Sequence, residues 1–104
     1  MTGNAVSLLV LAALSGATPS GFASDNAAAM ERMHEAMMAV RPSGDADRDF
    51  AATMIAHHQG AIDMARLELL YGKDETLRRL AQEIIVTQGQ EIEVMRRAAG
   101  DHRP

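Results

Sequence analysis

Cysteine is absent from this sequence of 104 residues. Disulfides, thiolate metal sites and a lipid-modified cysteine are therefore excluded. Aromatic residues are few, with two Phe, one Tyr and no Trp, and the basic residues form no block. The lack of a basic block argues against nucleic-acid binding. The sequence has no phosphate loop, nucleophile elbow or pair of acids at a defined spacing, so we do not expect an enzyme.

Charge is absent from the first 23 residues. The apolar run over residues 5–14 is too short to span a bilayer, which takes roughly 20 residues. It has the length of the central part of a secretory signal, about 7–15 residues. Small residues at Gly21 and Ala23 form a cleavage site. We therefore expect a signal peptide over residues 1–23 and a periplasmic or extracellular domain over residues 24–104, with no stable membrane anchor after cleavage.

The start of the chain also lacks the Lys or Arg that usually precedes the apolar run of a signal. The alternative is that this run is the buried first helix of a cytosolic bundle. Gly16, Pro19 and Gly21 argue against that alternative, because they would interrupt such a helix.

The remaining sequence has no strand pattern and no internal repeat. Residues 25–40, 47–71 and 75–99 are rich in helix-forming residues and contain no proline, which predicts three helices. Turns are predicted over residues 41–46 and 72–74. Short loops between long helices predict an all-α fold, an up-down antiparallel bundle of three main helices.

Methionine and histidine recur at helical spacing. One face of the first predicted helix carries soft side chains at i, i+3, i+4 and i+7: Met30, Met33, His34 and Met37. The second places Met54 and His58 on its apolar face, with His57 at the edge. In the third, Gln88 and Glu91 occupy positions where the pattern asks for apolar residues.

Antiparallel pairing predicts which of these residues lie at the same height. Folding about residues 42–45 brings Met30 level with His57, and Met33 and His34 level with Met54. Folding about the second turn brings His58 level with Gln88, and Met54 level with Glu91. The soft and ionisable side chains of all three helices are therefore expected to converge.

Such a set of side chains suits a soft metal. Thioethers select Cu(I), and imidazoles serve both Cu(I) and Cu(II), whereas zinc gains little from thioethers. We predict a copper buffer or carrier, with copper as Cu(I) or Cu(II) and zinc less favoured. The predicted metal-site residues are His57, His58, Met54, Met30 and Met33, then His34 and Met37, with Glu91 and Gln88 holding a ring N–H of His58.

Each of these residues also has a structural interpretation. Methionine often fills irregular gaps in a core, and the histidines could make buried hydrogen bonds in a dimerising bundle with no metal role. Three helices leave one side of a bundle open, so we expect a homo-oligomer, a dimer. The open side would carry Ile55, Ile62 and Leu69, or the methionine face of the first helix. Asp63 points away from the core stripe and is expected to pair with Arg66.

Several motifs of the chain resemble one family. Residues 54–65, with the sequence MIAHHQGAIDMA, are similar to the signature of the family called domain of unknown function 305. Further segments that resemble it are residues 30–38, 45–50, 71–74, 80–85 and 88–95. After Met95 the family commonly has a tryptophan and a leucine, and this chain has Arg96 and Arg97 instead.

The resemblance implies a ferritin-like helical bundle that is usually exported and that is associated with copper binding in some members. Carried over by position, the family's characteristic residues fall on His57, His58, Asp63, Gln88, Glu91, Met54, Met64 and Met95.

Overall fold

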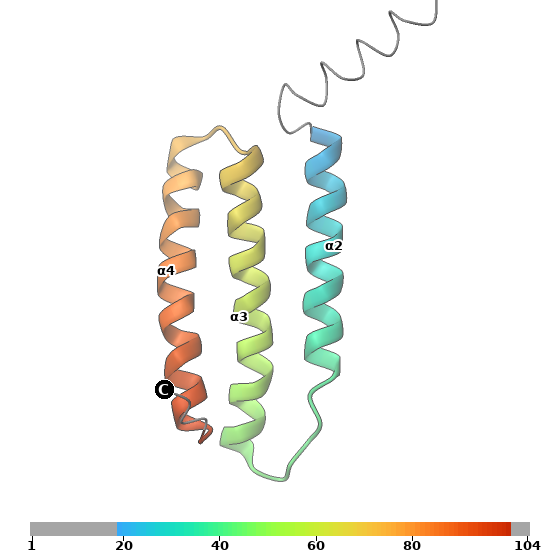
Figure 1. Cartoon of the computed structure of the whole chain (residues 1–104), viewed down its shortest axis with the longest axis vertical. Helices are drawn as coiled ribbons and strands as arrows, with labels where there is room; N and C mark the ends of the chain where they lie inside the picture. The colour runs from blue at the N-terminus through green and yellow to red at the C-terminus, as the bar shows by residue number, and fades with distance from the viewer. Residues whose placement is uncertain (1–18, 101–104) are drawn as a thin grey trace, which may run out of the picture.

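The computed structural model describes residues 19–100, and these form three long helices. They are α2 (Pro19–Met38), α3 (Ala46–Tyr71) and α4 (Glu75–Ala98), which run down, up and down in the view of Figure 1. The prediction of an all-α, up-down antiparallel bundle is confirmed. Within the described residues, no helix is both long enough and apolar enough to cross a membrane.

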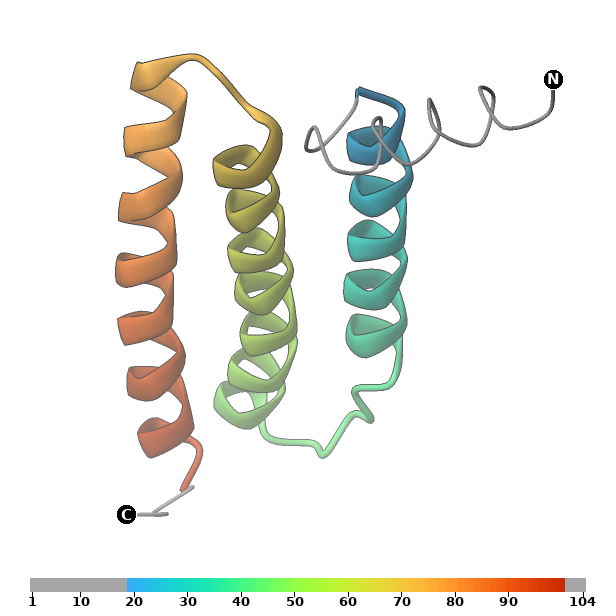
Figure 2. The ribbon, with the colours of Figure 1, turned by 45° about the horizontal axis from the view of Figure 1, so that its top comes forward.

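The three helices lie in a single layer. Helix α3 is in the middle and packs against both neighbours, whereas α2 and α4 do not contact each other. Figures 1 and 2 show the same side-by-side arrangement from two directions. The opposite sides of α3 are therefore occupied by different helices, and both faces of the layer are open along its length.

Aspartate residues begin the second and third of these helices. The Asp45 carboxylate accepts hydrogen bonds from the backbone N–H groups of Asp47 and Arg48, at 3.0 and 3.3 Å. The Asp74 carboxylate accepts from Leu77 N–H at 2.9 Å. These bonds satisfy donors that have no partner within the helix. The predicted bounds of both helices agree with the structure to within a residue or so.

The predicted start of the first helix is wrong. Helix α2 begins at Pro19, six residues before the expected start, and continues through Gly21 and Ala23. Proline suits the first position of a helix because its fixed φ is helical and its missing N–H would have had no partner there. The apolar run over residues 5–14, on which the signal-peptide prediction rests, lies outside the described residues, so cleavage after Ala23 stays a prediction.

Two aromatic rings and one acid hold the start of α2 against the end of α3. The rings of Phe22 and Tyr71 meet edge to face, with centroids 5.7 Å apart and planes 72° apart. The Tyr71 hydroxyl donates a hydrogen bond to the Asp25 carboxylate, at 2.5 Å between oxygens. The Phe22 contact gives α2 a reason to begin before the predicted cleavage site.

The register between α2 and α3 also differs from the prediction. Met33, expected level with Met54, instead packs against Gly60, six residues further along α3. The reason is the connection over residues 39–45, which continues below the end of α2 before α3 begins (Figure 1). Ser43 N–H bonds to both oxygens of Asp49, at 3.0 and 3.1 Å, and ties this segment to the first turn of α3.

The buried residues are small. The described residues with buried apolar side chains are Ala29, Ala51, Ala65, Ala81, Ile62 and Ile92, and no large side chain among residues 21–100 is fully buried. Ile62 is only 5% exposed, so its expected place on an open side is wrong. Met30 and Phe50 are 50% and 63% exposed. The single layer thus leaves large apolar side chains without cover.

Gly60 allows the close approach of α2 to α3, and its replacement tests the observed register. A Cβ at Gly60 would lie 2.8 Å from the Cβ of Met33, whereas a Cβ at Gly89 would meet nothing. We expect Gly60→Ala to lower the free energy of unfolding by about 1–2 kcal/mol despite the helix propensity of alanine. Gly89→Ala should raise it by up to about 1 kcal/mol. Urea unfolding followed by circular dichroism measures both, and equal stabilisation would contradict the register.

The Tyr71–Asp25 bond is tested by titration. The hydrogen bond to Asp25, followed by burial and the negative charge of Asp25, raises the pKa of Tyr71 above its usual value. Ionisation of the hydroxyl removes the donor, so the bond is present below this raised pKa and is lost as pH rises through it. We expect Asp25→Asn to lower the Tyr71 pKa and Asp47→Asn, at the far end of α3, to leave it unchanged. Tyr71 is the only Tyr and the chain has no Trp, so tyrosinate absorbance reports the pKa directly; an unchanged value in Asp25→Asn would reject the contact.

Candidate metal site

His58 joins α3 to α4. Its Nε2 lies 2.7 Å from Oε1 of Glu91. The His58 side chain is 12% exposed and that of Glu91 is 52% exposed. The expected contact between Glu91 and His58 is therefore present, because the short connection between α3 and α4 fixes their register to within about one turn.

The other ring nitrogen of His58 is buried without a partner. Nδ1 makes no hydrogen bond within the described residues, and the same holds for Oε1 of Gln88 on α4. A neutral imidazole that donates Nε2–H to a carboxylate has its lone pair on Nδ1. Buried polar atoms rarely lack a partner, and each such case requires an explanation. A bound cation at Nδ1 is one explanation, and it matches the carboxylate–histidine–metal arrangement.

Two further donors lie next to His58 on α3. Met54 is one helical turn before His58 and is half-buried. His57 is exposed, and the centroid of its ring is 6.0 Å from that of His58. This spacing is set by one helix and does not depend on how the helices pair. One thioether and two imidazoles thus occupy a single turn of α3.

The soft side chains of α2 do not converge on His58. Met33 packs on Gly60, which lies about 160° around α3 from His58 at 3.6 residues per turn. Met30 is half exposed, and its sulfur accepts a 3.8 Å hydrogen bond from Asn26 of its own helix. The expectation that Met30 and Met33 lie beside His57 and Met54 is therefore wrong, and the register of α2 is the cause.

His34 and Met37, the other two predicted ligands on α2, are displaced by the same register. His34 is exposed and Met37 is half-buried, and both belong to the helix that packs on the far side of α3 from His58. Within residues 19–100, no three His, Asp or Glu side chains cluster closely enough to hold a metal ion. A site built from described side chains around His57 and His58 would therefore draw on the thioether of Met54.

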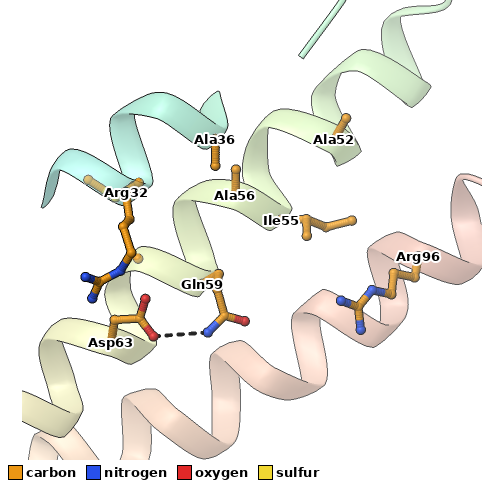
Figure 3. A pocket seen from close by; sticks show the side chains of 10 residues that line it. Arg32, Ala36, Ala52, Ile55, Ala56, Gln59, Asp63 and Arg96 are labelled. Atoms are coloured by element: carbon orange, nitrogen blue, oxygen red, sulfur yellow. Dashed lines mark hydrogen bonds between the residues drawn. The ribbon is translucent and has the colours of Figure 1, made fainter. Parts of the chain in front are cut away.

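Asp63 makes the surface pair that the sequence predicts. Its carboxylate is 3.9 Å from a guanidinium nitrogen of Arg66 and accepts a 3.2 Å bond from the Gln59 amide. The sequence did not indicate that Asp63 also lines a hollow of about 320 Å³, whose lining residues come from α2, α3 and, through Arg96, α4. Figure 3 shows Arg32 of α2 close to Asp63, with Arg96 of α4 further along the same face.

The fold and the residues on α3 define a small helical protein with a candidate soft-metal site. Residues 11–99 match the family described as Domain of unknown function (DUF305). Because this match covers most of the 104 residues, the chain belongs to that family. The match begins inside the segment predicted to be a signal. A comparison with curated proteins found none that matches the chain.

Proposed function

We propose that this protein is an exported metal-binding protein of the periplasm or extracellular space that buffers or carries copper. The observation that supports this most strongly is His58, whose Nε2 is held by Glu91 while its buried Nδ1 has no partner within the described residues. In this proposal Nδ1 is the principal ligand, and His57 and Met54 on the same turn of α3 supply the others.

The identity of the donors favours copper. A thioether binds Cu(I) far better than a hard cation, and imidazole binds both copper ions. The chain has no cysteine, so the site contains no thiol that an oxidising compartment could convert to a disulfide. Zinc is less favoured because it gains little from methionine.

Glu91 orients the imidazole in this proposal. A carboxylate that accepts Nε2–H fixes the tautomer and raises the basicity of the other nitrogen. Gln88 lies on the same face of α4, three residues before Glu91, and its buried Oε1 is available to a donor near the site. Glu91 would therefore act on the ring and not on the metal.

The alternative function is a structural or interaction module. The 2.7 Å His58–Glu91 contact stabilises the α3–α4 pair without any metal, and several large apolar side chains are exposed. Metal analysis of the protein purified from a periplasmic fraction separates the two functions, because only the first predicts stoichiometric copper.

Variants of α3 test the copper site. Replacing both His57 and His58 with Ala should remove most copper binding while leaving the helices formed. His34→Ala is the matched control, because His34 lies on α2 and should leave copper binding unchanged. Glu91→Gln should weaken binding on the order of 10–100-fold through loss of the orienting carboxylate. Titration with Cu(I) and Cu(II), with circular dichroism as the folding control, measures each variant.

Met54→Leu, which conserves volume, should weaken Cu(I) more than Cu(II), because the thioether favours the softer ion. If the folded His57→Ala/His58→Ala variant binds copper as the parent does, the site is wrong, and His58 is then a structural residue.

A further inference from the structure

The α3–α4 pair carries an apolar hollow that nothing in the described chain covers. Its volume is about 300 Å³. Its lining residues come from both helices: Ala61, Met64, Ala65, Glu68, Leu77, Leu80, Ala81 and Ile84. Leu77 and Leu80 are 52% and 48% exposed. Small alanines form part of the lining, and larger apolar side chains such as Leu77 and Leu80 form the rest of it.

This hollow faces away from the one that Asp63 lines. At 3.6 residues per turn, Ala61 lies about 160° around α3 from both Gln59 and Asp63, and Met64 lies about 140° from Gln59. The two hollows therefore open on opposite faces of the layer. Because α2 and α4 do not contact each other, no helix of the described chain crosses over the α3–α4 hollow.

The hollow is nearly uncharged. Glu68 is its one charged lining residue. The Glu68 carboxylate lies over Gly72, since a Cβ on that glycine would meet it within 2.6 Å. The negative charge of Glu68 therefore lies near the connection between α3 and α4, and the middle of the hollow is lined by methionine, leucine, isoleucine and alanine.

We propose that a second copy of this chain covers this face, so that two α3–α4 pairs pack as the two layers of a four-helix core. Helical domains are stable when two layers enclose one core, and the same face on both copies can close about a two-fold axis. The occupant is a second copy because the dimensions fit. Over their whole length, including the turn with Met54 and His57, two helices of 24–26 residues present about 750 Å² at 1.5 Å per residue and ~10 Å width, close to the ~800 Å² per partner of a stable interface.

Two exposed apolar residues on opposite sides of α4, Leu80 and Val86, provide a matched test. Leu80→Glu places a charge in the hollow, whereas Val86→Glu changes an apolar residue that is 60% exposed on the far side of α4. We expect light scattering of the full chain at tens of micromolar to give a dimer for the parent and for Val86→Glu. Leu80→Glu should be a monomer, with a dissociation constant raised at least tenfold and helical circular dichroism retained.

A cysteine placed in the hollow gives a second readout that does not depend on breaking the interface. The chain is free of cysteine, so Ile84→Cys should form a disulfide-linked dimer under mild oxidation and Val86→Cys should not. A parent that is monomeric at this concentration would overturn the proposal. The proposal would also be overturned if Leu70→Glu dissociated the dimer and Leu80→Glu did not, because the Leu70 side chain lies on the opposite face of α3. Both measurements are made without copper, so a monomeric parent overturns the dimer and leaves the copper titrations of the His57 and His58 variants as the separate test of the metal site.

Discussion

Helix α3 packs against two helices, α2 and α4, that do not contact each other. One side of it packs on α2 through Gly60, where Met33 sits against the backbone, and the other side packs on α4 through His58 and Glu91. The residue types on each side follow from this constraint. A glycine is needed where a large side chain approaches, and a histidine bridges where a polar partner faces it. Because both contacts are made by one helix, the angular position of a residue around α3 determines whether it faces α2 or α4.

This constraint separates the methionines into two groups. Met54 lies one turn from His58 and belongs to the side that faces α4. Met33 lies on the side that faces α2, and Met30 points into solvent with half its surface exposed. The methionine face of α2 therefore contributes to packing and to the surface, whereas the soft donors beside His58 come from α3 alone. A flat layer of three helices also explains why small residues and two isoleucines make up the buried core.

The short α3–α4 connection made part of the site predictable from sequence. With three residues between the helices, the height of Glu91 relative to His58 could be inferred to within a turn. The long Glu91 side chain reaches across the remaining offset between the two residues. The seven-residue connection before α3 allowed no such inference, because it runs on past the end of α2 before turning. The start of α2 was missed for a related reason: Pro19 and Gly21 read locally as interruptions, and the packing of Phe22 on Tyr71 comes from a residue about fifty positions away.

The proposed copper site assigns a different role to each nitrogen of the His58 imidazole: Nε2–H stays bonded to Glu91, and Nδ1 binds the metal. The most direct measurement is nitrogen-15 NMR of the histidine rings during titration with Cu(I), which is diamagnetic. We predict that the Nδ1 resonance of His58 shifts on saturation with Cu(I), while Nε2 keeps its proton. A His58 ring whose nitrogens are both unchanged at saturation, or one that loses the proton on Nε2, would contradict it.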